Sequence, residues 1–218
     1  MPEVTIVPYE NKYRDTVRRC VYETGYGGKS ADIYFEDPEL FGDLNVSYYT
    51  DYEPGSAFIA LAGGEPAGYL LGCLDTARFE KYYNKIIVPG IVSNALRFRY
   101  NMTPAIWRYL LRGVLILMRN ESPGAPHDEY PAHLHINLFK EFRRTGTGGK
   151  LIAAYLAFLR ERCVPGVHLI TSSVHTESHS FYEKLGFTRL NETRVKLSPF
   201  KEIDGKDLYN ITYVMKLT

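Results

Sequence analysis

Arg143-Arg144-Thr145-Gly146-Thr147-Gly148 is the stretch on which the fold assignment depends. Glycine stands at three of the four positions 146–149, and glycine permits a left-handed backbone and the close approach of a ligand. Residues 132–139 before it alternate between apolar and polar types, which predicts a strand, and residues 150–162 after it have helical periodicity. The loop therefore leads into a helix, whose first amides lack intrahelical partners and favour an anion.

The spacing within this loop excludes two common nucleotide sites. A Walker loop needs Ser or Thr directly after its Lys, but Leu151 follows Lys150. The dinucleotide fingerprint needs a glycine at position 151, which is Leu. The cations of Arg143, Arg144 and Lys150 still suit a pyrophosphate.

The loop and a second motif together resemble one superfamily. Arg143-x-x-Gly146-x-Gly148 is similar to the CoA-binding signature of the GNAT acetyltransferases, and Phe181-Tyr182-Glu-Lys-Leu-Gly186-Phe187 resembles their Phe-Tyr-x-Lys-x-Gly-Phe element. The resemblance covers residues 130–190 well, whereas residues 1–74 agree only in element order. It implies an acetyl-CoA-dependent N-acetyltransferase that moves the acetyl group to a primary amine by direct attack in a ternary complex.

The order of the expected elements places the chain in the α/β class, or α+β with a mixed sheet. With the resemblance, we expect a GNAT fold whose central, mixed, mostly antiparallel sheet has about seven strands flanked by helices. Residues 1–218 would form a single domain, with residues 75–130 as a helical insertion between strands 3 and 4. Residues 48–55, rich in Tyr and ending in Pro-Gly, are expected to form a loop.

The resemblance also implies a set of cofactor-binding residues. The backbone at the end of the fourth strand would contact the acetyl and pantetheine groups, and the amides of the loop would hold the pyrophosphate. His175 stands where many relatives have an Asn near the pantetheine, and it could instead lie at the surface. The full set is Leu138, Phe139, Arg143, Arg144, Thr145, Gly146, Thr147, Gly148, Gly149, Lys150, His175 and Ser178.

Three residues are candidates for catalysis. Tyr182 matches the Tyr that often serves GNAT enzymes as the acid for the departing thiolate, although it could simply pack against the sheet. His133 and His135 share one face of the fourth strand, and an imidazole suits a general base at neutral pH. Relative to the related arylalkylamine N-acetyltransferases they lie one residue out of phase, so without a β-bulge they would face the other side of the sheet. Asp128, Glu129 or a water chain could replace them.

The acceptor and the activity itself stay open at this level. The carboxylates of Asp43, Asp51 and Glu53, near several tyrosines, could receive a cationic amine from a small molecule, a peptide or a protein lysine. Residues 131–138 also resemble the acetyltransferase-like domain of some O-GlcNAcases, which brings in a catalytically inactive acetyl-CoA-binding module as an alternative. A longer acyl donor or a hydroxyl acceptor is a second alternative.

Composition limits the partners and the compartment. The net charge of +1 provides no global field for nucleic acid or an anionic membrane, so we expect neither as a partner. Three cysteines without metal-ligand spacing fit a reducing compartment and no metal cofactor. Without a secretory signal or a membrane-length apolar run, we expect a cytoplasmic protein, with a homodimer left as an option.

Overall fold

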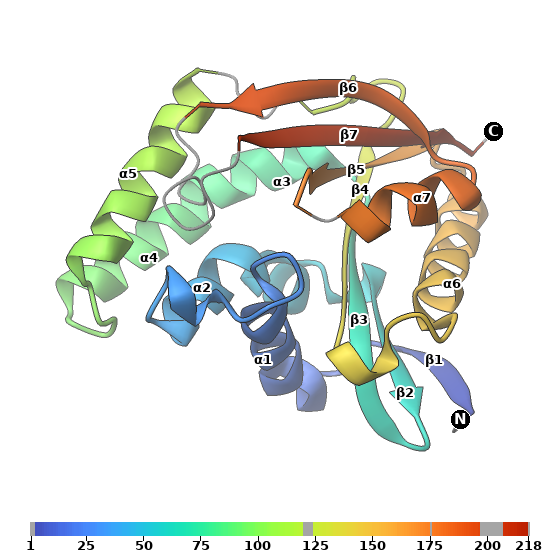
Figure 1. Cartoon of the computed structure of the whole chain (residues 1–218), viewed down its shortest axis with the longest axis horizontal. Coiled ribbons are helices and arrows are strands. Elements are labelled where there is room, and N and C mark those ends of the chain that lie inside the picture. The colour runs from blue at the N-terminus through green and yellow to red at the C-terminus, as the bar shows by residue number, and fades with distance from the viewer. Residues whose placement is uncertain (1–2, 120–123, 175, 197–206, 218) are drawn as a thin grey trace.

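The computed structural model describes residues 3–119, 124–174, 176–196 and 207–217. It contains a seven-stranded sheet in the order β1-β2-β3-β4-β5-β7-β6, flanked by helices on both faces (Figure 1). The strands are β1 Val4–Pro8, β2 Ala57–Ala62, β3 Glu65–Cys73, β4 Ala132–Leu138, β5 Gly166–Ser172, β6 Thr188–Val195 and β7 Leu208–Lys216. The helices are α1 Arg14–Thr24, α2 Pro38–Asn45, α3 Thr76–Tyr82, α4 Val88–Leu96, α5 Pro104–Met118, α6 Thr147–Glu161 and α7 Thr176–Lys184.

The sheet is mixed and mostly antiparallel, as the sequence predicts. Only β4 and β5 pair in parallel among the described strands. The segment between β3 and β4 is helical and contains α3, α4 and α5. No helix in the described parts of the chain is long and apolar enough to cross a bilayer.

Side-chain alternation along the central strands produces two apolar cores, one on each face of the sheet. On one face, Tyr69 and Leu71 of β3 pack with residues of α1 and α2. On the other face, Leu134 of β4 packs with Leu151 and Tyr155 of α6, and α7 adds Tyr182 to this second core. The strand β4 therefore separates the α1 side of the molecule from the α6 side.

Strands β4 and β5 part soon after they begin. Their pairing covers only Ala132 with Val167 and His133 with His168, although both strands continue for several residues. Along the other edge, β4 stays paired with β3 as far as Leu138, and the Phe139 N–H donates to the Ala67 carbonyl at 3.1 Å. Alternation in an antiparallel ladder then turns the N–H and C=O groups of Ile136 and Leu138 toward the gap.

One local prediction was wrong. Residues expected as a loop contain a π-helical turn at Tyr48–Tyr52, followed by a 3-10 turn at Pro54–Ser56. Packing explains the difference, because the rings of Tyr48 and Tyr49 are buried against Phe79 of α3, with centroids 4.7 and 5.8 Å away. Local composition favours a loop there, and contacts with a distant helix override it.

Candidate active site

The glycine loop forms the beginning of α6 through a left-handed residue. Gly146 precedes the helix with φ of +83°, and Arg144 is also left-handed at +61°. The Lys150 N–H donates to the Gly146 carbonyl at 3.2 Å and closes the first turn. The amides of Thr147, Gly148 and Gly149 therefore have no acceptor within the helix and form its positive end.

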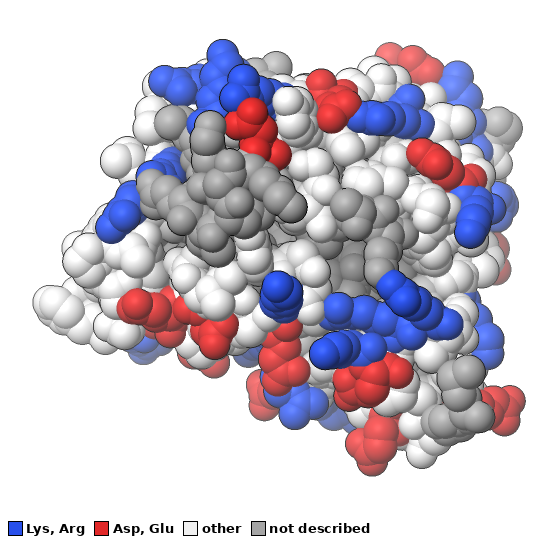
Figure 2. Space-filling model, in the orientation of Figure 1, with Lys and Arg blue, Asp and Glu red and all other residues white. Residues whose placement is uncertain are grey.

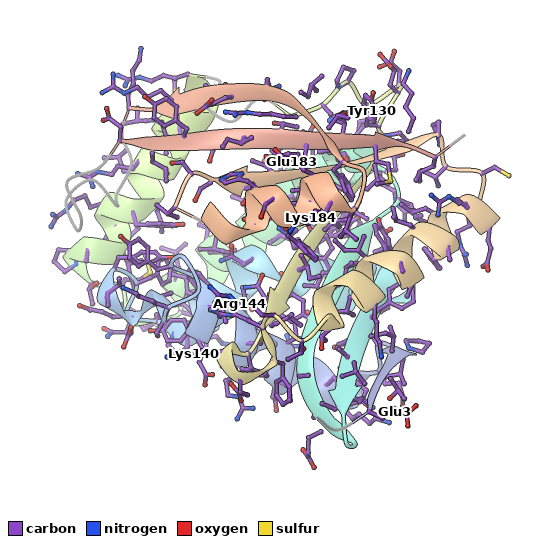
Figure 3. All side chains as sticks on the ribbon, turned by 45° about the vertical axis from the view of Figure 1, so that its right-hand side comes forward. Glu3, Tyr130, Lys140, Arg144, Glu183 and Lys184 are labelled. Atoms are coloured by element: carbon purple, nitrogen blue, oxygen red, sulfur yellow. The ribbon has the colours of Figure 1, made fainter. Side chains whose placement is uncertain are left out.

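A cavity of about 600 Å³ lies between this loop, the end of β4 and α7. Space at Gly146 is open, since a Cβ added there would meet no atom within 4 Å. Figure 2 shows Lys and Arg side chains gathered below α7 and over the loop, and Figure 3 shows Arg144 on the loop and Lys184 on α7. The lining residues are Ile136, Leu138, Arg143, Arg144, Gly146, Gly148, Gly149, Ser178, Ser180, Phe181, Tyr182 and Lys184.

Arg143 connects this cavity to the opposite face of the sheet. Its Nε donates to the Leu138 carbonyl at 3.1 Å, and its Nη1 donates to the Gly28 carbonyl at 3.0 Å. Gly28 belongs to the turn after α1 and has φ of +84°; a Cβ there would collide with the guanidinium. Arg143 thus holds the end of β4 and the α1–α2 connection together.

The structure does not bring every expected cofactor residue into the cavity. The Lys150 Nζ turns away and donates to the Val4 carbonyl of β1 at 3.1 Å. Thr145 and Thr147 bond to each other through their hydroxyl oxygens, 2.7 Å apart, and Thr147 is buried. Both backbone groups of Phe139 are occupied, because its carbonyl accepts the Phe142 N–H at 3.0 Å.

Two further cofactor predictions lie in the segment that enters α7. Ser178 lines the cavity, and its Oγ lies 3.4 Å from the Thr171 Oγ1 of β5. His175 lies outside the described residues, so its predicted contact stays a prediction.

Tyr182 places its ring between the core and the cavity. The side chain is buried, packs near Phe181, Phe187 and Tyr213, and also lines the cavity. Burial raises the pKa of the Tyr182 phenol above its ordinary value of 10. The phenol therefore keeps its proton at neutral pH and can act as a hydrogen-bond donor.

His133 is held in one tautomer by a buried hydrogen-bond network. The Thr76 hydroxyl donates its proton to the Pro131 carbonyl at 2.7 Å, so the His133 Nδ1, 2.8 Å away, must donate to Thr76. The Nε2 then accepts from the Tyr49 hydroxyl at 2.7 Å. Burial first, and then neighbouring histidines, hold the His133 pKa well below 6.5. Both ring nitrogens are occupied, which does not suit a general base.

His135 lies two residues along the same face and lines a second cavity of about 180 Å³. The β3–β4 register contains no bulge, so both histidines face the α1 side, opposite the larger cavity. As a residue His135 is exposed, and its ring centroid lies 5.4 Å from that of Tyr49 on one side. Loss of surrounding solvent first, and then His168, lower the pKa of His135, so its imidazole is neutral at pH 7.

Two more histidines, His127 and His168, line the same small cavity. Their rings are stacked with centroids 6.2 Å apart, and the His168 Nδ1 lies 2.9 Å from the Tyr130 carbonyl. Within the described residues, however, no group of three or more His, Cys, Asp or Glu side chains is placed to hold a metal ion.

The three carboxylates considered for a cationic acceptor are already paired. Asp51 accepts hydrogen bonds from Nε and Nη2 of Arg14, each at 3.2 Å. Asp43 pairs with the buried Arg18 at 2.9 Å and accepts from the Tyr100 hydroxyl. Glu53 accepts three bonds of 2.8 Å, from Tyr48, Ser56 and the Leu74 amide. These groups hold the α1–α2 side together, and the structure does not support them as an acceptor site.

Sequence reasoning missed several residues that line the larger cavity: Ile136, Ser180, Phe181 and Lys184. Lys184 occupies the Lys position of the Phe-Tyr-x-Lys motif, so the motif itself could have indicated it. A Cβ added at Gly148 would lie 3.1 Å from the Phe181 ring, which explains why a glycine suits that position. Ser180 has no comparable sequence signal.

Comparison with known proteins agrees with this geometry. A family model described as an acetyltransferase (GNAT) domain matches residues 120–197. The crystal structure of SsHAT is 27% identical, with a TM-score of 0.75 over 100% of both chains. Two more distant structures share the fold. The structure of yncA from Salmonella typhimurium with its cofactor acetyl-CoA is 11% identical, with a TM-score of 0.58 over 99% of this chain and 94% of that one. The Drosophila melanogaster polyamine N-acetyltransferase, which forms N-acetylagmatine, is 15% identical, with a TM-score of 0.59 over 98% of this chain and 100% of that one. The chain therefore has the GNAT fold, and its residues 120–197 match the acetyltransferase (GNAT) domain family.

Proposed function

We propose that this chain is an acetyl-CoA-dependent N-acetyltransferase that transfers the acetyl group to a primary amine by direct attack in a ternary complex. One observation carries the proposal. Strand β4 separates a large cavity beside the positive end of α6 from a smaller histidine-lined cavity, and it parts from β5 between the two. The donor would occupy the first cavity, and the amine would approach from the second.

The donor half has the chemistry that CoA needs. The amides of Thr147, Gly148 and Gly149 offer donors to a pyrophosphate at a helix N-terminus. Arg144 and Lys184 line the same cavity from two elements and add positive charge. The pantetheine arm would lie along the β4 edge, where Ile136 and Leu138 present backbone groups. Salmonella yncA, similar in fold, holds acetyl-CoA as its cofactor, which supports this donor.

The thioester carbonyl would accept a hydrogen bond from the Leu138 N–H. The Leu138 carbonyl already accepts from Arg143, so its amide is the group left for the ligand. Negative charge grows on the thioester oxygen as the amine attacks, and a fixed amide donor stabilises that charge. The tetrahedral intermediate then breaks its C–S bond and releases the CoA thiolate.

Tyr182 would stabilise this departing sulfur by donating a hydrogen bond. Burial raises its pKa further above that of a thiol, which is about 8.5. Complete proton transfer from the phenol to the thiolate would therefore run uphill. Tyr182 can stabilise the thiolate through a hydrogen bond while its phenol keeps the proton. Solvent can then protonate the CoA thiolate.

His135 would remove the proton that the attacking ammonium group must lose. It is neutral at pH 7, exposed to the small cavity and on the acceptor side of β4. His133 is kept out of this role by its bonds to Tyr49 and Thr76. The Drosophila polyamine enzyme of similar fold forms N-acetylagmatine, which supports a primary amine as the acceptor class.

Calorimetric titration with acetyl-CoA tests the donor site through Gly146→Asp. A carboxylate at this open position would face the pyrophosphate, so acetyl-CoA binding should be abolished. Gly64→Asp is the matched control, because Gly64 is also left-handed (φ +91°) and a Cβ there also meets no atom within 4 Å, but it does not line the cavity. Equal affinity in Gly146→Asp and the wild type would overturn the donor site.

Thiol release over a panel of amines then tests turnover. Acceptor-dependent release supports the transferase. Acetyl-CoA binding without release for any amine would instead identify a binding module without catalysis.

A further inference from the structure

The helical arm formed by α4, α5 and the turn between them exposes an unusual amount of apolar surface. Phe98 in the turn is 94% exposed, and Leu96 and Met118 are 76% and 78% exposed. Figure 1 shows the arm at one end of the molecule, and Figure 2 shows its lower tip mostly in white, with Lys and Arg side chains gathered at the upper end of this region. Its exposed large side chains are Val88, Val92, Leu96, Phe98, Trp107, Leu111, Val114 and Met118.

Helix α5 is apolar on two faces, and the described residues of the chain cover only one of them. Ile106 is fully buried, and Leu110 packs beside it against the α1-side core. The outward residues 107, 111, 114 and 118 follow a spacing of four, three and four. This is the spacing of a helix that packs along another helix. A helix with two apolar faces is normally buried on both.

The amount of exposed surface fits a stable interface. Large side chains contribute about 150–250 Å² each when fully exposed, so the exposed fractions of the eight amount to roughly 1,000 Å². The largest patch of a typical monomer is about 300–600 Å², whereas each partner of a standard interface buries about 800 Å². The arm therefore carries enough apolar surface for one side of a dimer.

We propose that a second copy of this chain covers the arm, with α5 of one subunit packed on α5 of the other. The composition is that of an interface core, rich in aromatic residues, Met and Arg, and without Asp or Glu. Residues 81–119 contain seven basic and no acidic residues: Lys81, Lys85, Arg97, Arg99, Arg108, Arg112 and Arg119. A second copy is always present at equal concentration, and twofold symmetry is the commonest way to bury such a face.

The backbone of the turn adds an independent sign of function. Phe98 has φ of +56°, a conformation that costs energy for an aromatic residue, while its side chain is almost fully exposed. Strain of this kind persists where the surrounding structure or a partner uses it. A contact across the dimer would bury the Phe98 ring. This proposal does not depend on acetyl transfer.

Sedimentation equilibrium over a wide concentration range tests the dimer, and Trp107 reports on the surface itself. Trp107 is the single tryptophan of the chain and is 59% exposed. Dimer formation through the arm should shift its emission to shorter wavelength in step with the mass.

Leu111→Glu should weaken the dimer by about tenfold or more. Leu190→Glu on β6 is the matched control, since Leu190 is also exposed but lies away from the arm, and it should not change the mass. If circular dichroism shows that Leu111→Glu disturbs the fold, Met118→Glu repeats the test at the other end of the stripe.

Several results would overturn the proposal. These are a monomer at every concentration, equal weakening by Leu190→Glu, or a dimer that leaves the Trp107 emission unchanged. A monomer whose Trp107 emission shifts only with phosphatidylserine vesicles would assign the arm to a membrane surface instead.

Discussion

The Tyr49 hydroxyl donates a 2.7 Å hydrogen bond to Nε2 of His133, far from it in sequence and buried with it. Tyr49 belongs to the π-helical turn on the α1 side, and His133 belongs to β4. The bond therefore joins the α1 side of the molecule to the central strand, and it explains why one of the two β4 histidines is structural.

Removing this hydroxyl should destabilise the fold. Tyr49→Phe leaves a buried imidazole nitrogen without a donor, which costs about 1–3 kcal/mol. Urea unfolding measures the change. Tyr52→Phe is the control, because the Tyr52 side chain is 42% exposed and should change stability by less than about 0.5 kcal/mol. Equal effects of the two variants would mean that the His133 bond contributes nothing specific.

Mild acid should also destabilise the protein. The pKa values of the buried His133 and His168 are lowered in the fold, chiefly by burial, whereas unfolded histidines titrate near pH 6.5. The unfolded chain thus binds more protons below that pH, so the stability is complete above about 6.5 and is lost as pH falls toward the lowered values.

Urea midpoints at about pH 7.5 and pH 5 should differ, in a window above the titration of ordinary carboxylates near pH 4. His133→Gln should flatten part of this dependence. A wild-type protein equally stable at both pH values would contradict the prediction.

Tyr182→Phe should lower kcat more than it weakens the binding of acetyl-CoA. Loss of a hydrogen bond to a charged sulfur costs about 10- to 100-fold in rate, while the ring still fills the second core. Steady-state kinetics and calorimetry separate the two effects. Unchanged kcat would leave Tyr182 with a packing role alone.

His135→Gln should lower kcat/KM by about 10²- to 10⁴-fold if His135 is the base. Because its pKa is lowered, the wild-type rate should stay level as pH falls through 6.5, after allowance for protonation of the acceptor amine. His127→Gln, which lines the same cavity, is the matched control and should retain the rate. Full activity of His135→Gln would leave proton removal to water.

Arg143→Ala and Arg143→Lys distinguish the positive charge of Arg143 from its hydrogen bonds to Leu138 and Gly28. Both variants lose the pair of bonds to Leu138 and Gly28, but Lys keeps the cation. We expect both to weaken acetyl-CoA binding and to lower stability by about 1–3 kcal/mol. Wild-type affinity in Arg143→Lys would show that only the charge matters.

Much of the fold could be predicted because its signals are local. The alternation of residues 132–138 and the periodicity after Gly149 each depend on a few neighbours, and the structure confirms a strand and a helix there. The turn at Tyr48–Tyr52 could not be predicted in this way. Its backbone depends on rings from α3 that are about thirty residues away.

In the candidate site, too, the sequence predicts local features but not those that depend on distant contacts. The position of the loop before α6 follows from the spacing of its glycines, but the directions of its side chains do not. The Lys150 ammonium bonds to β1 near the N-terminus, and Arg143 reaches Gly28 beyond α1. The face occupied by His135 depends on a β3–β4 register without a bulge, which needs the partner strand to be known.

Because β4 parts from β5, the sheet consists of two halves, called leaves here, which are joined only by the short β4–β5 ladder. Strands β1 to β4 form one leaf and β5, β7 and β6 form the other, and the shared ladder covers two residue pairs. Each leaf therefore ends in an edge that has lost its neighbour beyond these two pairs. A pantetheine arm, which carries amide groups of its own, would act as a missing strand, so that the substrate completes the architecture that binds it.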